Sequence, residues 1–442
     1  MEKNIDLNKK TPVWVTRCYY LCLLCGILFS ISNSQMFGYI ATLISLFVVA
    51  KARKEDIFIY LLGTQFLRAV LKVDLGFTNM SYLMFVYILW IFRFYLKRSK
   101  KLRVIECIPF VLFFWDMVVS FVWGVTKVGD NLLWTISLLV MVVTLIEDSK
   151  YVNLNGMIYY YCLAIWCVCL INVFKEFALY GQSLTPSMYG TFLSTGSYFS
   201  FGKAYAEVAG GNGIALDTIL GIAMCIILIY EKEKEHRIFY LCTIVFFAYC
   251  GMMCVARAFY IEVGIFLFLF ILAQTKKPLR FCGIVLGIII VSQIAVISFS
   301  QYINPVILAV QRRFELGNAD REGLLNSAKM LLLSKPSILM FGAGSYYPDV
   351  FNFTSHNLFY DILVSLGILG SIVYAIAILK TGIEYVIRCG KFSLLYFIPT
   401  IILISYKMIS GSMRDVQFYY MLAMVLIFYM KMKWKEIRWK RI

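Results

Sequence analysis

The chain has 442 residues, of which 61% are hydrophobic and only 15% are charged, and its mean hydropathy is +0.79. Apolar runs of about 16 to 24 residues recur along it, which excludes a soluble globular protein and predicts an all-α polytopic membrane protein forming one integral domain over residues 1–442. The formal net charge of +17 is compatible with nucleic-acid binding, but the distribution of the basic residues argues against it.

We expect about fourteen membrane-spanning helices. In chain order they are 13–31, 36–50, 57–71, 79–96, 104–125, 131–146, 154–174, 211–230, 238–255, 258–274, 281–301, 357–379, 393–409 and 417–430. The first run follows Lys3, Lys9 and Lys10 as a signal peptide would, but no convincing small-residue cleavage site follows it. We therefore interpret it as a retained span.

The basic residues divide unequally between the two sides that these spans define. Twenty-eight Lys and Arg fall on the side of the two termini and eleven on the other. The positive-inside rule places the richer side in the cytoplasm, so both termini are expected to be cytoplasmic. The high net charge then reflects orientation and contact with anionic headgroups of the lipid bilayer, and nucleic acid is not an expected partner.

Two long loops, residues 175–210 and 301–356, are expected on the external side. Loops of this length in a compact protein are usually functional or disordered, and neither has the low hydrophobicity of disorder. The first is rich in Tyr, Ser, Thr and Gly. Such a composition suits contact with a sugar, although a lid that packs over the helices without any ligand is an open alternative.

The second external loop is predicted to contain an amphipathic helix, in "NADREGLLNSAKMLLLSKP". Asn318 and Asp320 are candidate caps, and Pro336 follows its end. Arg321 lies at its N-terminus, where a cation is unfavourable for the helix dipole, so anion binding explains this arginine better than helix stability does. One apolar face is expected, formed by Leu324, Leu325, Ala328, Leu331 and Leu332.

His356 is the only histidine on the predicted external side, in "SHNLFYDILVSLGILG", because His236 lies in the cytoplasmic "EKEKEHR". A histidine titrates near neutrality and is therefore the one ordinary side chain here suited to accept a proton. The alternative is an interfacial residue with a hydrogen-bonding role alone.

Arg257, in "CVARAFYIEVGIF", is expected at an external turn between two nearly continuous spans. An arginine at membrane depth costs roughly 2.5–3.5 kcal/mol and needs a partner or an anionic ligand. A structural ion pair with Glu262 is the alternative to ligand binding.

The predicted external side has no pair of histidines, no D-x-D and no close carboxylate cluster, so we expect no metal and no cofactor. Arginines hold phosphate groups by forked hydrogen bonds in place of a metal. Since ATP is absent outside the cell, a donor used there must arrive already activated. A sugar linked to a lipid diphosphate meets these conditions.

Residues 205–380 resemble the superfamily of bacterial membrane glycosyltransferases that contains O-antigen ligases and O-antigen or capsule polymerases. The pattern is an Arg after a span (Arg257), an Arg opening a loop helix (Arg321), a G-x-G turn, and His-Asn leading a span with Gly-x-x-Gly, here His356, Asn357, Gly367 and Gly370. "GGNGIALDTIL", with Asn212, resembles the start of the span after the first external loop. Ala256 is a departure, because serine is common before the arginine.

The resemblance implies metal-independent, inverting transfer of an undecaprenyl-diphosphate-linked glycan to an acceptor glycan at the outer face of the bacterial cytoplasmic (inner) membrane. It implies that Arg257 and Arg321 hold the diphosphate and that His356 is the general base. Arg312 and Arg313 compete for the role of Arg321, and Asn357 and Asn212 are possible supporting residues. Other polysaccharide-assembly proteins are further possible partners.

Polymerisation of lipid-linked repeat units is preferred over ligation to lipid A-core or another surface acceptor. Polymerases diverge more in sequence, and the match of this chain to the superfamily pattern is partial. A flippase for lipid-linked oligosaccharides is the alternative from another class. Flippases usually show internal repeats and charges across the bilayer depth, whereas the distinctive charges here gather at the outer side. A scaffold protein would leave the long loops and His356 unexplained.

The predicted topology is tested by reporter fusions. Fusions near residues 190 and 345 are expected to report an external location, and fusions near residues 100 and 233 and at the C-terminus a cytoplasmic one, because the basic loops stay inside. Paired alkaline phosphatase and fluorescent-protein fusions measure both outcomes. A cytoplasmic location for the loop that contains Arg321 would exclude external glycan chemistry.

Overall fold

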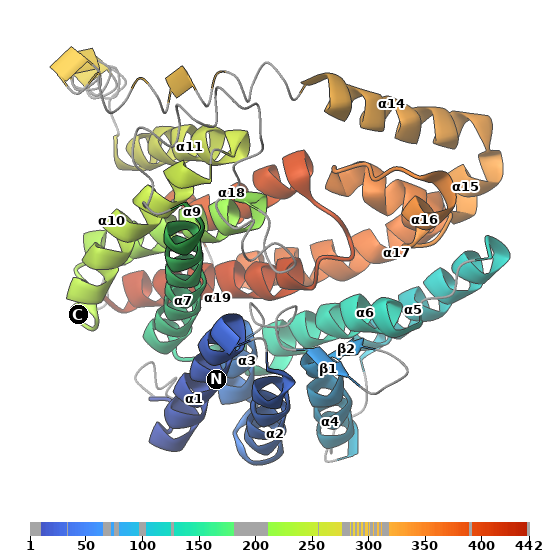
Figure 1. Cartoon of the computed structure of the whole chain (residues 1–442), viewed down its shortest axis with the longest axis horizontal. Coiled ribbons are helices and arrows are strands. Elements are labelled where there is room, and N and C mark those ends of the chain that lie inside the picture. Colours follow the sequence, from blue (N-terminus) through green and yellow to red (C-terminus); the bar gives the residue numbers. More distant parts are fainter. Residues whose placement is uncertain are drawn as a thin grey trace. The chain divides into compact units, whose positions relative to one another are not determined.

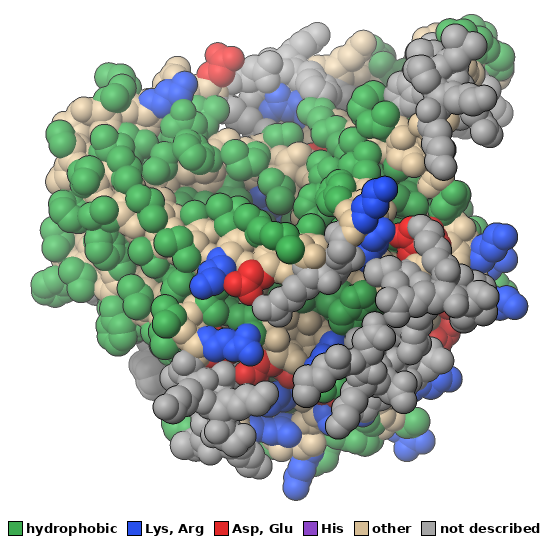
Figure 2. All heavy atoms as spheres, turned by 180° about the vertical axis from the view of Figure 1, so that it is seen from behind, with side chains coloured by type: hydrophobic (Ala, Val, Ile, Leu, Met, Phe, Trp, Pro, Cys, Tyr) green, Lys and Arg blue, Asp and Glu red, His purple; other side chains and the backbone are tan. Residues whose placement is uncertain are grey.

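The computed structural model describes residues 10–32, 34–64, 72–74, 79–96, 103–124, 128–180, 211–254, 256–275, 318–388 and 391–439, with isolated positions between 283 and 311. These residues are almost entirely helical, and six helical stretches are long and apolar enough to cross a membrane. Hydrophobic side chains cover much of the face in Figure 2, as a surface in contact with lipid requires. The all-α class is confirmed and a membrane protein is supported, while the count of fourteen spans and their orientation stay predictions.

The chain divides into two compact units. Unit 1 comprises Met1–Ala164, Arg321–Phe392 and Lys407–Ile442, and unit 2 comprises Ile165–Asp320 and Ser393–Tyr406. A single membrane domain over residues 1–442 stays a prediction.

Unit 1 contains most of the helices and one short hairpin (Figure 1). Its elements are α1 (Val13–Ser32), α2 (Gln35–Lys51), α3 (Lys54–Thr64), β1 (Lys72–Asp74), β2 (Asn79–Ser81), α4 (Tyr82–Leu96), α5 (Val104–Val122), α6 (Val128–Val143), α15 (Pro336–Phe341), α16 (Tyr347–Phe351), α17 (Leu358–Arg388) and α19 (Val416–Trp439), with nearly all of α14 (Asn318–Ser334).

Unit 2 contains α9 (Gly211–Tyr230), α10 (Arg237–Met253) and α11 (Arg257–Gln274). Both α10 and α11 pack against α9. The ring of Phe259 lies where a side chain on Gly251 would project, so the turn between α10 and α11 is tight. The helices α7 (Leu154–Tyr180) and α18 (Leu394–Ser410) are shared between the units.

The helix bounds agree with the expected spans within a few residues at most positions, and the largest differences are the ends of α17 and α19, which lie beyond the expected residues 379 and 430. The antiparallel hairpin pairs Val73 with Met80 and was not predicted, because strands of three residues are too short for a periodicity signal. After Val143 the helix continues as one π-helical turn. Residues 65–71, most of the expected span 281–301, and residues 181–210 of the first external loop lie outside the described residues.

The predicted amphipathic helix is confirmed as α14. Ala328, Leu331 and Leu332 are buried in one cluster with Tyr347 and Val364, while Leu324 and Leu325 are half-buried. The apolar face of α14 therefore attaches the second long loop to α16 and α17.

The helix α17 is broken at Gly367, whose φ and ψ are 65° and −177°. The break frees carbonyl groups that continuous helix would have used. The backbone N–H of Ala343 donates to the Val364 carbonyl at 2.7 Å, and that of Gly344 donates to the Ser365 carbonyl at 2.9 Å. The turn "GAG" thus supplies the donors that the broken helix lacks, which matters because an unpaired backbone group in hydrocarbon costs several kcal/mol.

Glycine is required on both sides of this contact. A Cβ on Gly342, which has a φ of +89°, would lie 2.2 Å from the Ser365 carbonyl oxygen. A Cβ on Gly367 would lie 2.5 Å from backbone atoms of Met340, Phe341 and Gly342. At Gly367 the backbone at the end of α15 therefore approaches α17 closely.

Replacing Gly367 by alanine tests this packing. We expect Gly367→Ala to lower the free energy of unfolding by about 2–3 kcal/mol, because it combines a strained positive φ with a backbone clash. The apparent Tm of the purified protein, followed by tryptophan fluorescence, measures the change. Gly382→Ala in the same helix is the control, since its nearest neighbour would be the Leu426 Cδ1 atom at 3.8 Å. Equal Tm values for the two variants would contradict the assigned contact.

Candidate functional site

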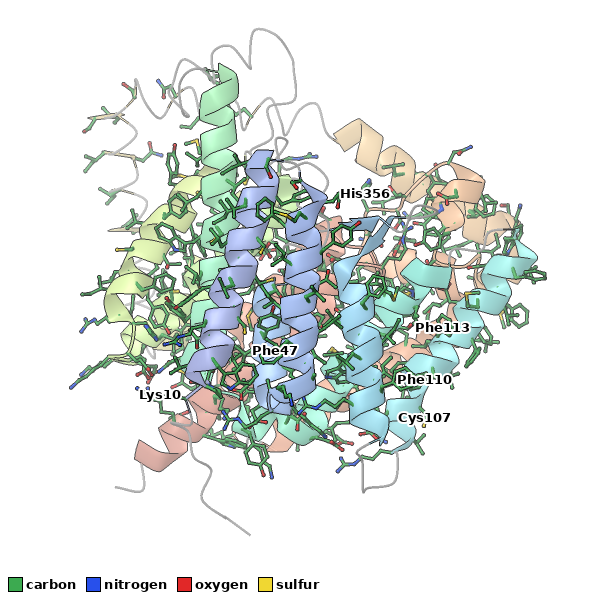
Figure 3. The ribbon with its side chains drawn as sticks, turned by 60° about the horizontal axis from the view of Figure 1, so that its bottom comes forward. Lys10, Phe47, Cys107, Phe110, Phe113 and His356 are labelled. Atoms are coloured by element: carbon green, nitrogen blue, oxygen red, sulfur yellow. The ribbon has the colours of Figure 1, made fainter. Side chains whose placement is uncertain are left out.

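His356 lies in the loop between α16 and α17, is exposed to solvent and has a left-handed backbone, with a φ of +47°. This region is uncommon for residues other than glycine and costs on the order of 1–3 kcal/mol. Figure 3 shows His356 toward one end of unit 1, with Lys10 and Cys107 toward the other. A strained conformation on an exposed titratable residue is typical of a functional position and needs support from its surroundings.

Tyr347 supplies that support from beneath the loop. Its hydroxyl accepts a hydrogen bond from the backbone N–H of Ser355 at 2.9 Å and donates one to the Asp361 carboxylate at 2.9 Å. All three residues are buried. Burial, together with the neighbouring Asp361 carboxylate, raises the pKa of Tyr347 well above its usual value, so the hydroxyl keeps its proton at neutral pH.

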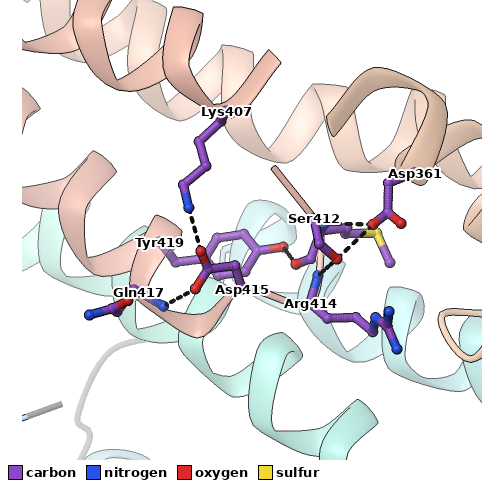
Figure 4. A network of polar contacts seen from close by, with 8 residues as sticks. Asp361, Lys407, Ser412, Arg414, Asp415, Gln417 and Tyr419 are labelled. Carbon is purple, nitrogen blue, oxygen red and sulfur yellow. Dashed lines mark hydrogen bonds and ion pairs between the residues drawn. The ribbon is translucent and has the colours of Figure 1, made fainter. Parts of the chain in front are cut away.

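The Asp361 carboxylate extends this support to a second turn, residues 411–415 (Figure 4). Its other oxygen accepts hydrogen bonds from the Ser412 hydroxyl at 2.9 Å and from the Met413 backbone N–H at 2.7 Å. An ion pair between Lys407 and Asp415 closes the same turn. One buried carboxylate therefore connects the loop that bears His356 to the turn that bears Arg414.

Arg414 lies on the turn with its guanidinium carbon 5.2 Å from the centre of the Tyr346 ring. It is also close enough to interact electrostatically with Asp116 of α5. The Asp116 carboxylate accepts two hydrogen bonds of 2.7 Å from the backbone and hydroxyl of Ser345, and one of 3.4 Å from the indole of Trp134. We call Asp116, Ser345, Tyr347, Asp361, Ser412 and Arg414 the polar network.

Asn357 has a structural role. Its side-chain oxygen accepts the backbone N–H of Tyr360 at 3.2 Å, which caps the start of α17, and its amide donates to the Met408 carbonyl. Arg321 lies in the first turn of α14 and Asn212 is the second residue of α9. The side chains of both, and the predicted site residues Arg312 and Arg313, lie outside the described residues.

Arg257 is the first residue of α11, directly after the turn that follows α10, as expected. The Ser405 hydroxyl donates to the Glu262 carboxylate, whose oxygens lie 2.8 and 2.9 Å away, and the ion pair between Glu262 and Arg257 considered from the sequence stays untested. Arg257 belongs to unit 2, whereas Arg321 and His356 belong to unit 1. The convergence of these three residues therefore stays a prediction.

Sequence reasoning identified none of the six members of the polar network, including its ionisable residues Asp116, Asp361 and Arg414. Asp116 and Asp361 lie inside expected spans, where an ionisable residue is costly and is a functional candidate by default. A search for isolated carboxylates within apolar runs would have found both. Asp116, for example, is bound by Ser345, which lies more than two hundred residues later in the chain. No sequence pattern connects the two residues.

Within the described parts of the chain, no three His, Cys, Asp or Glu side chains converge as a metal-ligand group. Comparisons with protein-family models, with curated proteins and with solved structures found no match to this chain. The resemblance to membrane glycosyltransferases therefore rests on the sequence pattern of residues 205–380.

Replacing Tyr347 by phenylalanine tests whether the network holds the His356 loop. The change leaves the Ser355 N–H and one Asp361 oxygen without this partner, at a cost of about 1–3 kcal/mol. We expect amide exchange at residues 352–357 to accelerate by about ten- to a hundredfold, measured by hydrogen–deuterium exchange mass spectrometry.

The matched control is Tyr360→Phe, because the Tyr360 hydroxyl makes no hydrogen bond to the described residues and its ring is half-buried nearby. Unchanged exchange in Tyr347→Phe, or equal acceleration in both variants, would show that the hydroxyl does not support the loop.

Proposed function

We propose that this chain is a membrane glycosyltransferase that polymerises undecaprenyl-diphosphate-linked repeat units into a surface polysaccharide. The reaction takes place at the outer face of the cytoplasmic membrane and is metal-independent. The observation that carries the proposal is His356, an exposed imidazole held in a strained left-handed backbone by a buried polar network. Surroundings that maintain strain at a titratable residue are typical of a catalytic position.

In the proposed reaction, His356 accepts the proton from a hydroxyl group of the acceptor glycan. The acceptor oxygen forms a bond with the anomeric carbon of the donor sugar from the face opposite the diphosphate. The bond between that carbon and the diphosphate oxygen breaks, and the diphosphate leaves with the bonding electron pair. Attack from the opposite face inverts the configuration at the anomeric carbon. The proton then passes from His356 to solvent, which returns the base to its neutral form.

Cationic side chains stabilise the charge that develops on the leaving diphosphate. Arg257 and Arg321 take this role in the resemblance, and a charged hydrogen bond of this kind contributes about 1.5–3 kcal/mol. Arg414 lies in the polar network that supports the His356 loop, and it adds a cation that the resemblance does not include. Its guanidinium carbon lies 5.2 Å from the centre of the Tyr346 ring, within cation–π distance, and a guanidinium can bind phosphate oxygens by forked hydrogen bonds.

The acceptor in this proposal is a second lipid-linked repeat unit, which makes the enzyme a polymerase. A ligase would use the same donor chemistry with lipid A-core or another surface molecule as the acceptor. The partial match to the superfamily pattern favours the more divergent polymerases.

Replacement of His356 separates catalysis from a structural role. General-base catalysis typically contributes about 10² to 10⁴-fold, so His356→Ala is expected to lower polysaccharide chain formation at least about a hundredfold. The measurement is the amount of polymer made in the native host, deleted for the chromosomal copy and supplied with each variant at matched protein levels.

His236→Ala is the matched control, because His236 is the other histidine of the chain and also has a left-handed backbone, with a φ of 58°. It lies on the predicted cytoplasmic side and is expected to leave polymer formation unchanged. A near-normal amount of polymer from His356→Ala would refute the assignment of His356 as the general base. Normal joining of repeat units in His356→Ala, with loss of glycan transfer to lipid A-core, would favour the ligase.

A further inference from the structure

An apolar groove of about 650 Å³ runs along α5 beside α15, entirely within unit 1. Val111, Phe114, Val118 and Val122 line its α5 side at helical spacing, and Phe341 at the end of α15 lines the other. From Val111 to Val122 the stripe is about 16 Å long, at 1.5 Å per residue. The groove therefore has the length and direction of an extended hydrocarbon segment lying along a membrane helix.

The described residues leave the groove open. Phe114 and Val118 are each 64% exposed, Val122 is 72% exposed and Phe341 is 51% exposed. A contiguous apolar surface of this kind marks contact with lipid or with a ligand. Its lining comes from one row of α5 side chains and the end of α15, which fits one chain better than the paired chains of an ordinary phospholipid.

A cation lies at one end of the groove. The ammonium of Lys335 is 4.9 Å from the centre of the Trp123 ring, which lines the groove, and 5.0 Å from that of Phe351. Lys335 is exposed, and both rings lie within cation–π distance of it. Trp and Lys together are typical of the headgroup depth of a bilayer, so this end is the mouth and the rest of the groove extends into hydrocarbon.

The mouth is also connected to the His356 loop. Trp123 and Phe351 pack against the same buried cluster as Tyr347, whose hydroxyl holds the Ser355 backbone. An anionic headgroup at Lys335 would therefore lie beside the structure that supports His356.

We propose that this groove binds the chain of a polyprenyl phosphate, with Lys335 as a cation for its phosphate in addition to the arginines proposed for the diphosphate. The inference rests on the proposed function, since it assigns the lipid part of the donor to the α5–α15 groove. Charge complementarity at the mouth selects an anionic headgroup, and the narrow apolar stripe selects a single long chain.

Photocrosslinking of the full-length protein in nanodiscs tests the site, with a polyprenyl phosphate that carries a diazirine in its chain. We expect labelling of residues 111–123 and 337–342. Val118→Trp fills the groove and is expected to lower labelling at least about tenfold. Val245→Trp is the control, because Val245 is 72% exposed on α10 and does not line this groove.

The variant Lys335→Gln tests the headgroup site. It is expected to weaken the binding of polyprenyl phosphate about five- to tenfold and to leave the binding of uncharged polyprenol unchanged. Lys329→Gln, at another exposed lysine of the same loop, is expected to change neither. The proposal is overturned if labelling survives Val118→Trp, if the two lysine variants behave alike, or if a two-chain phospholipid competes equally well. The labelling assay measures lipid binding and does not depend on glycosyl transfer. Specific labelling of a protein that makes no polymer would therefore refute the proposed function but support the assignment of the groove.

Discussion

Backbone carbonyl groups inside an apolar protein layer need hydrogen-bond donors, and this constraint organises the part of unit 1 around α15 and α17. Gly367 breaks α17 and frees carbonyls at Val364 and Ser365, which the Gly342–Gly344 turn then occupies. The indole N–H of Trp115 lies 3.1 Å from the Leu366 and Phe341 carbonyls and completes the junction. The single break therefore pairs α17 with the end of α15, whose Phe341 also lines the apolar groove.

Buried carboxylates carry the connection from this junction to the candidate site. Asp116 binds the backbone and hydroxyl of Ser345, directly after the glycine turn, and Asp361 binds Tyr347 on one side and the Ser412 turn on the other. Each carboxylate accepts several hydrogen bonds, which offset the cost of burying a charged or polar group in an apolar layer. The network thereby connects three loops, and the exposed His356 lies at its edge.

The proposed chemistry assigns separate tasks to separate parts of this framework. A proton acceptor belongs in water, where the glycan is, whereas a lipid chain belongs against an apolar helix face. His356 and the groove of α5 satisfy these opposite demands within one unit, and Lys335 lies at the boundary between them.

Hydrophobic periodicity alone determined the helical class, most helix bounds, the buried face of α14 and the turn before Arg257, since these depend on local spacing that every apolar run repeats. The sequence also indicated His356, as the one histidine on the less basic side. The three-residue hairpin, the broken α17 and the partners of Asp116 and Asp361 were decided only by the tertiary structure. Gly367 shows the reason: a glycine within an apolar run is compatible with continuous helix, and it becomes a break only where a distant turn brings donors for the freed carbonyls. Asp116 likewise acquires its role from Ser345, 229 residues later in the chain, and a contact over that separation leaves no local pattern.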